Sequence, residues 1–170
     1  AERYALSTAD DMAPYTTEMR NRFHGTAAMA LRPASVEEVS AILKLASESG
    51  TAIIPQGGNT GLVGAGVPLD GGTGEEVIVS LGRMNRILEV DADTNTMTVE
   101  SGAILENIQK AADDAERLIP LSLGSPGTCQ IGGNISANAG GTGGIAYGNT
   151  RELVMGLEGV LPDGRVWNGL

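Results

Sequence analysis

Two glycine-rich segments without charged residues constrain the fold of this 170-residue chain more than any other feature. The first, "IPQGGNTGLVGAGVP", runs from Ile54 to Pro68 and has five glycines within ten residues. The second spans residues 119–150 and holds nine glycines and three asparagines, with no charged side chain and no histidine. Loops of that length are usually functional or disordered, and disordered segments are typically charged and poor in apolar residues. We therefore expect the second segment to be buried and to line a ligand.

The first segment has the composition of an anion-binding loop. Glycine lets the backbone adopt positive φ and lets a ligand approach closely, and successive N–H groups then form a nest for a phosphate. Such a nest needs no cation, which suits a chain with a net charge of −10. Asn59 and Thr60 would add side-chain donors. The alternative is that these glycines only form tight turns.

Two common phosphate motifs are not present. A Walker A loop ends in Gly-Lys followed by Ser or Thr, and no such sequence occurs. A dinucleotide fingerprint opens a helix, whereas Gly64-Ala65-Gly66 runs into Val67-Pro68. We therefore expect no nicotinamide site of the Rossmann type.

The composition limits which binding partners and which cellular compartment we expect. The acidic balance argues against a nucleic-acid surface, which needs a basic patch, and no apolar run is long enough for a membrane span. Cys129 is the single cysteine, so an internal disulfide is excluded. A reducing compartment is then the default, and we expect a cytoplasmic protein.

Local patterns predict helices and strands along most of the chain. The clearest helix spans residues 35–50, where Ser35 and Glu38 form a capping box and Gly50 is the stop. Before it, residues 1–27 read as a lead-in that is loosely structured or helical. Periodicity and turn residues predict the remaining elements: strands at 29–33, 51–55 and 76–80, a hairpin with arms 87–90 and 96–100, a helix at 103–115, and a hairpin turning at Pro162-Asp163-Gly164.

Several longer stretches resemble one family. They are "PQGGNTGLVGAGVP", "SLGRMNRILEVDADTNTMTVESGAIL", "GTCQIGGNISANAGG" and "AYGNTRELVMGLEGVLPDGRVWNGL". Together they resemble the vanillyl-alcohol-oxidase-type, or PCMH-type, FAD-binding proteins over nearly the whole chain. Within them the chain is most similar to the FAD-linked D-2-hydroxyacid dehydrogenases. That branch includes D-2-hydroxyglutarate dehydrogenase, D-lactate dehydrogenase and the FAD subunit of glycolate oxidase.

The resemblance implies an α+β fold of two subdomains with FAD extended between them. The expected division is a lead-in at 1–27, a first FAD-binding subdomain at 28–102, and the start of a second at 103–170. By the family pattern this is the N-terminal portion only, and the substrate domain with its catalytic residues lies beyond Leu170. We assign no catalytic residue and no metal ligand to this chain, and we expect it to be inactive alone.

The resemblance also implies which residues contact FAD. The loop corresponding to the family's pyrophosphate loop contains Gln56, Gly57, Gly58, Asn59, Thr60, Gly61 and Leu62. The second FAD-contacting stretch contains Gly127, Thr128, Gly132, Gly133, Asn134 and Asn138. Relatives with a histidyl-flavin bond often carry the histidine in the pyrophosphate loop, where this chain has Asn59 and Thr60. Non-covalent FAD is therefore expected.

Other residues receive structural interpretations. His24 lies in a polar lead-in far from both loops, and we do not expect it to be catalytic. Cys129 has no electropositive neighbour in sequence and is expected to be a small buried residue. Tyr147 either packs on the flavin or closes its loop, with the second reading favoured. The carboxylates Asp113, Asp114 and Glu116 are expected on a solvated helix face.

The function implied by the resemblance is oxidation of a D-2-hydroxy acid to a 2-oxo acid by hydride transfer to flavin N5. The full-length protein would bind a hydroxy-acid substrate and an unidentified electron acceptor, and a homodimer is an assembly that the resemblance allows. The rival hypothesis is a stand-alone module that binds a nucleotide or phosphometabolite without catalysis.

Overall fold

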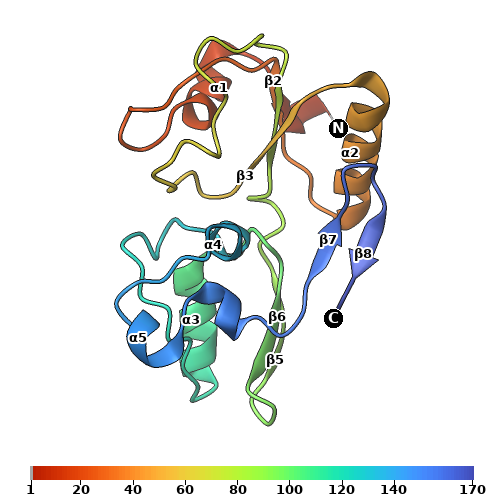
Figure 1. The fold of residues 1–170 in the computed structure, drawn as a ribbon. Coiled ribbons are helices and arrows are strands. Elements are labelled where there is room, and N and C mark those ends of the chain that lie inside the picture. Colours follow the sequence, from red (N-terminus) through yellow and green to blue (C-terminus); the bar gives the residue numbers. More distant parts are fainter. Residues whose placement is uncertain (1) are drawn as a thin grey trace. The chain divides into compact units, whose positions relative to one another are not determined.

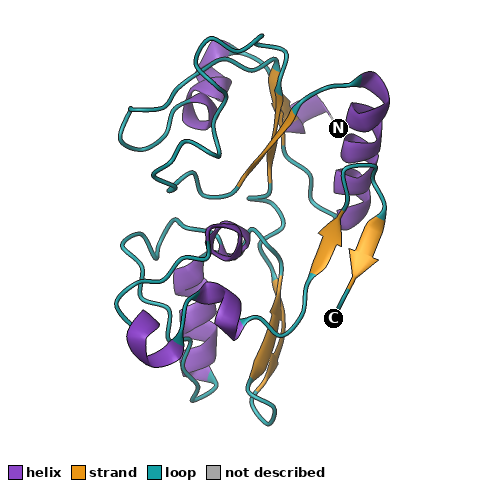
Figure 2. Ribbon diagram, viewed as in Figure 1, coloured by secondary structure: helices purple, strands orange, loops and turns teal. Residues whose placement is uncertain are grey.

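The computed structural model describes residues 2–170, which form two compact units. The first unit contains the chain up to Arg83 together with Gly156–Leu170, and the second contains Met84–Met155. Both units mix helices with strands (Figure 2), which agrees with the predicted α+β class.

A four-stranded sheet forms the centre of the first unit. Its strands are β1 (Ala5–Leu6), β2 (Met29–Leu31), β3 (Ile53–Gln56) and β4 (Val77–Ser80), in the order β1-β2-β4-β3. β4 pairs in parallel with both β2 and β3, and β1 pairs with β2 in the antiparallel sense. Because β4 has a strand on each side, Ile78 and Val79 are almost completely buried.

Two helices cover this sheet on opposite sides, α1 (Ala9–Thr16) and α2 (Val36–Ser49) (Figure 1). Met12 of α1 packs with Ala30 and Ile78 in the core. A short 3-10 helix, η1 (Glu2–Tyr4), precedes the first strand. The lead-in, expected to be loosely structured or helical, thus contains a helix, and it also adds a strand that was not predicted.

The predicted helix start at Ser35 is confirmed with one difference. The Ser35 hydroxyl accepts a hydrogen bond from the Glu38 N–H at 3.3 Å. The Glu38 carboxylate, however, accepts from the N–H of Ala34, at 2.7 Å, rather than from that of Ser35. Gly50 ends the helix in the left-handed region, with φ of 71°.

The predicted C-terminal hairpin is confirmed as β7 (Glu158–Val160) and β8 (Val166–Asn168), and it belongs to the first unit. Its turn sits against α2, where the Ser40 hydroxyl donates to the Gly164 carbonyl at 2.5 Å. Gly164 has φ of 85°, and a Cβ there would lie 2.7 Å from the Ser40 carbonyl oxygen. This position therefore requires glycine for both its conformation and its close approach.

The second unit pairs a hairpin with helices. The hairpin strands are β5 (Ile87–Asp91) and β6 (Thr96–Val99), and α3 (Leu105–Asp114) packs beside β5. Two shorter helices, α4 (Ile131–Ala137) and α5 (Gly144–Tyr147), and the 3-10 helix η2 (Thr150–Leu153) follow. Leu105, Leu121 and Cys129 form its core.

Two expectations about this region need correction. Residues 119–150 are not one long loop, because they include α4 and α5. Nor are they buried throughout: Leu121 and Cys129 are buried, whereas Ile145 and Tyr147 are exposed.

Candidate cofactor site

The first glycine loop begins at the carboxyl end of β3 and is closed at its base by Gln56. This side chain is buried, and its amide nitrogen donates to the carbonyl oxygens of Tyr15 at 2.8 Å and Gly66 at 2.6 Å. One residue therefore joins the two ends of the loop and ties both to α1. The Gln56 side chain therefore has a structural role, because it fixes the base of the loop.

Asn59 ties the middle of the loop to the segment after α1. Its side-chain nitrogen donates to the carbonyl oxygens of Thr17 at 2.8 Å and Pro14 at 3.2 Å. Both amide protons are thus used within the chain, so the expectation that Asn59 supplies a side-chain donor to a ligand is wrong. Its φ of 52° makes it the residue that turns the backbone in this part of the loop.

The backbone of the loop supplies the unused donors. Among the described residues, no backbone N–H from residues 57–66 donates a hydrogen bond; the next donor along the chain is Val67, to Gly64. Residues 57–60 are half-buried, and no proline or acidic residue interrupts the ten-residue run. Backbone N–H groups withdrawn from solvent require a partner. A row of such groups in a segment without an acidic residue of its own fits a diphosphate, as the nest hypothesis requires.

The second stretch divides into residues that serve the fold and residues that are free to contact a ligand. Gly132 donates its N–H to the Ser101 carbonyl at 2.8 Å, and a Cβ there would lie 2.8 Å from the Ser101 Cβ. Thr128 donates its N–H to Ser125 at 3.1 Å. By contrast, Gly127 and Gly133 are exposed, and a Cβ at Gly133 would meet nothing within 4 Å.

Two amide oxygens on α4 and its cap are buried without a donor. They are Oδ1 of Asn134 and Oε1 of Gln130, four residues apart at the start of the helix. A buried acceptor without a partner is costly, so these oxygens point to a donor that the chain does not provide. Gln130 was not among the predicted site residues; its place directly before the Gly132-Gly133-Asn134 motif was the available signal.

Asn138 has a role in the fold of the second unit. It ends α4 with φ of 48°, and its Oδ1 accepts from the N–H of Arg151 at 3.1 Å. Cys129, in the core of the same unit, is buried, as predicted. Burial raises the pKa of its thiol, and a hydrogen bond with Asn134 acts in the opposite direction. A high pKa disfavours the reactive thiolate.

The predicted site residues therefore fall into two groups, one in each unit. In the first unit Gln56 ends β3 and the other six lie on the loop after it; in the second unit six lie on the turn before α4 and along that helix. The structure brings each group together locally. Within the groups, Gln56, Asn59, Gly132 and Asn138 already make specific contacts inside the protein.

Sequence reasoning missed the partner of the first loop, which is the turn between Thr17 and His24. Arg20 donates from its guanidinium to the Leu62 carbonyl, and the Phe23 ring lies where a Cβ at Gly64 would sit, 2.6 Å from the ring carbon. A single charge, Glu18, is buried in this polar stretch. Nothing in the local pattern distinguishes it from the exposed charges around it.

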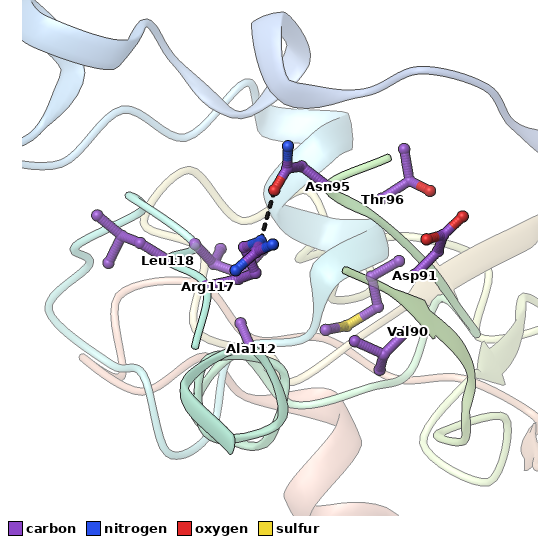
Figure 3. A pocket seen from close by; sticks show the side chains of 9 residues that line it. Val90, Asp91, Asn95, Thr96, Ala112, Arg117 and Leu118 are labelled. Atoms are coloured by element: carbon purple, nitrogen blue, oxygen red, sulfur yellow. Dashed lines mark hydrogen bonds between the residues drawn. The ribbon is translucent and has the colours of Figure 1, made fainter. Parts of the chain in front are cut away.

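A separate cavity of about 240 Å³ lies in the second unit between β5, β6 and the end of α3 (Figure 3). Ligand pockets are usually larger, roughly 300–1,000 Å³. Arg117 lines it, but its guanidinium donates to Asn95 Oδ1 at 2.6 Å and to the Ala92 carbonyl at 2.8 Å. None of the predicted site residues lines this cavity, and we assign it no ligand.

The remaining predicted residues lie as follows. His24 is exposed and pairs with Thr17 in an isolated bridge. Tyr147 is 54% exposed, and the carboxylates Asp113, Asp114 and Glu116 are exposed, as expected for a solvated helix face. Within residues 2–170, no three His, Cys, Asp or Glu side chains cluster in a way that would hold a metal ion. Over the same residues, no helix has the length and apolar character needed to cross a membrane.

Comparison with known proteins decides the family. A family model described as an FAD binding domain matches residues 27–169. The chain belongs to this FAD-binding family. FAD is accordingly the cofactor of the domain, and the unused N–H row after β3 fits its diphosphate.

Relatives and solved structures agree with the family. The chain is 39% identical over 165 residues to the mitochondrial D-2-hydroxyglutarate dehydrogenase of Arabidopsis thaliana, covering 97% of this chain and 29% of that protein. It is 43% identical over 146 residues to the mitochondrial D-2-hydroxyglutarate dehydrogenase of Danio rerio, covering 86% of this chain and 27% of that protein. The fold matches alkyldihydroxyacetonephosphate synthase with a TM-score of 0.86 at 21% identity, over 99% of this chain and 32% of that one.

These matches bear on two further expectations. The resemblance to PCMH-type flavoproteins is confirmed, and the chain spans less than a third of the length of the relatives just named. The expected cytoplasmic location is contradicted, because both relatives are mitochondrial proteins. The error has a clear cause. A single cysteine excludes an internal disulfide, but the cellular location of a protein is set by targeting segments rather than by the composition of its folded domain.

Proposed function

We propose that this chain is the FAD-binding part of a flavin-dependent oxidoreductase that oxidises a D-2-hydroxy acid to the corresponding 2-oxo acid. The observation that carries the proposal is the uncharged run of residues 57–66, whose N–H groups have no acceptor within the described chain. The names of the similar dehydrogenases support the substrate class. FAD, when bound, supplies at N5 the acceptor for the hydride that leaves the substrate's α-carbon.

In this reaction, the role that we propose for this chain is to bind and orient FAD. We assign the diphosphate to the backbone of Gly57, Gly58, Thr60, Gly61 and Leu62, with Gln56 and Asn59 holding that backbone in shape. A chain with a net charge of −10 repels anions at long range, so the attraction must come from these short-range N–H dipoles.

The second stretch is assigned to the rest of the cofactor. Gly133 offers exposed backbone with nothing within 4 Å of where a Cβ would sit, whereas the exposed backbone of Gly127 has the Glu106 Oε2 3.2 Å from that point. The oxygens of Gln130 and Asn134 offer acceptors for ring N–H groups. This surface is kept in shape by contacts within the unit that involve Thr128, Gly132 and Asn138. We assign no catalytic acid or base to this chain; His24 is exposed on the turn after α1.

Flavin retention by the full-length protein tests the diphosphate assignment. Replacing both Gly57 and Gly58 with valine places Cβ atoms on the loop and disturbs the nest, so the purified double variant should lose its flavin absorbance. Gly124→Val is the matched control, because a Cβ at Gly124 would meet nothing within 4 Å. Normal flavin content in the double variant would overturn the assignment of this loop.

The reaction is tested by mixing the yellow full-length protein with hydroxy acids without oxygen. D-2-hydroxyglutarate or D-lactate should bleach the flavin absorbance, and the L-enantiomers should leave it unchanged. A colourless full-length protein that takes up no added FAD but binds another nucleotide would instead favour the stand-alone binding module. If the protein is yellow but neither the D- nor the L-hydroxy acids bleach it, the proposed D-2-hydroxy acid substrate is wrong.

A further inference from the structure

The turn between α1 and β2 is folded around a buried carboxylate. Glu18 is only 2% exposed although it lies in the polar sequence "TTEMRNRFHGT". One carboxylate oxygen accepts from the N–H of Arg20 and the other from the N–H of Arg22, both at 2.7 Å. The Glu18 N–H in turn donates to the Phe23 carbonyl at 3.0 Å. A single side chain thus organises the whole turn.

The carboxylate is held in its charged form. Burial alone would raise the pKa of Glu18, but the backbone N–H groups around it and the Arg20 guanidinium, 3.7 Å away, outweigh that effect and lower the pKa. Carboxylates that accept several backbone N–H bonds behave in this way. The turn therefore stays closed around a negative charge at neutral pH.

Three contacts connect this turn and its flanks to the glycine loop. The Arg20 guanidinium donates to the Leu62 carbonyl, the Phe23 ring packs against Gly64, and Asn59 donates to the Thr17 carbonyl at 2.8 Å. They hold the loop at three positions along its length, Asn59, Leu62 and Gly64. None of them uses a loop N–H group, so the loop is held while its donors stay free.

We infer that the Thr17–His24 turn is a clamp that holds residues 57–66 in their cofactor-binding shape, and that Glu18 and Arg20 are positioning residues for FAD. The inference rests on the proposed function. It adds to it a segment N-terminal to the matched family domain, which begins at residue 27. A loop rich in glycine loses much backbone freedom on binding, and a clamp that orders it beforehand strengthens binding without touching the ligand.

Glu18→Gln is the main test, in the full-length protein. The amide keeps the size of the carboxylate but has one acceptor oxygen, so the N–H of Arg20 or Arg22 is left facing an NH₂ group. Glu48→Gln is the matched control, because Glu48 is exposed on α2. We expect the dissociation constant for FAD to rise about tenfold or more in Glu18→Gln, as for loss of a charged hydrogen bond, and to stay unchanged in the control.

Limited proteolysis without flavin separates positioning from general destabilisation. In Glu18→Gln, proteinase K should cut faster within residues 57–66, while cutting within the buried strand β4 should keep its wild-type rate. Faster cutting in both regions would show that Glu18 only stabilises the unit, and it would overturn the inference. Unchanged cutting in the loop, or faster loop cutting with unchanged FAD affinity, would also overturn it.

A second pair of variants covers the case in which Glu18→Gln does not fold. Arg20→Met removes the contact to Leu62, and Arg22→Met removes an equal charge from the same turn, where the side chain is exposed. FAD affinity should fall in the first and not in the second; equal affinities would contradict the clamp. If the wild-type protein does not bind FAD, the proposed function fails, whereas the proteolysis data still decide whether the turn shapes the loop.

Discussion

The side-chain nitrogen of Asn59 lies 2.8 Å from the carbonyl oxygen of Thr17, a residue 42 positions earlier in the chain. The same nitrogen reaches Pro14, and Asn59 itself has φ of 52°. Asparagine tolerates the left-handed region better than most residues with a side chain. One residue thus provides both the turn of the glycine loop and its attachment to the segment after α1.

Replacing Asn59 should separate these two contributions. Asn59→Gly keeps the left-handed conformation and loses two hydrogen bonds, which should lower the free energy of unfolding by about 1–3 kcal/mol. Asn59→Ala loses the same bonds and adds backbone strain of roughly 1–2 kcal/mol. Urea unfolding should therefore rank the wild type above Asn59→Gly and that variant above Asn59→Ala. The reverse order of the two variants would contradict the conformational role.

Two neighbouring glycines of α4 should respond in opposite ways to alanine. A Cβ at Gly132 would lie 3.0 Å from the Ser101 carbonyl oxygen and closer still to its Cβ, whereas a Cβ at Gly133 would meet nothing. Gly133→Ala should stabilise the helix by up to about 1 kcal/mol, the difference in helix propensity. Gly132→Ala should destabilise the unit by about 1–3 kcal/mol, as overpacking does. Thermal unfolding of the two variants without flavin measures whether each substitution raises or lowers the stability of the unit.

Glu100 should make stability depend on pH in the acid range. Hydrogen bonds from the Arg86 side chain lower its pKa, burial acts against them, and the Arg86 N–H and charge add to the lowering. Because the pKa is lower in the folded state, the unfolded chain binds the proton more tightly. The stabilisation is therefore complete above the usual glutamate pKa of about 4.3 and disappears as the pH falls through the folded value.

Glu100→Gln should accordingly be less stable than the wild type at pH 7, and the difference should shrink on acidification below about pH 4.3. Denaturant unfolding at a series of pH values measures this. A Glu100→Gln difference that stays constant down to pH 3 would contradict the role of the ion pair.

Cys129 should react slowly in the folded protein. Its side chain is 3% exposed and burial raises its pKa. The thiolate, which is the reacting form, is therefore scarce and shielded. A disulfide reagent at pH 8 should label the native chain at least about tenfold more slowly than the chain unfolded in urea, given how strongly reactivity follows the thiolate fraction. Equal rates would show that the second unit opens readily around α4.

Neither His24 nor Cys129 should carry a covalent flavin. They are the single histidine and the single cysteine of this chain; the histidine is exposed outside the glycine loop, and the cysteine is buried in the core of the second unit. Neither position suits a covalent bond to a cofactor on residues 57–66. Mass spectrometry of the digested holoprotein should find the peptides that contain these two residues at their unmodified masses, and a flavin mass on either peptide would contradict this.

The sequence by itself determined the elements whose causes are local. Ser35 and Gly50 mark the ends of α2 through capping and a left-handed stop, Pro162-Asp163-Gly164 marks the last hairpin, and the uncharged glycine run marks the loop to which we assign the diphosphate. Each depends on residues within a few positions of one another. Periodicity and turn chemistry record such relationships directly, and the family motif lies within the same stretches.

Only the tertiary structure decided which residues hold that loop and which remain free. The carboxylate of Glu18 looks like any surface charge until the turn closes around it, and Asn59 looks like a ligand donor until Thr17 and Pro14 take its amide. Gly132 and Gly133 are equivalent in sequence, yet only Gly132 packs on Ser101. The contacts of Asn59 and Gly132 join residues about 30 to 45 positions apart, and a local pattern carries no record of a partner at that distance.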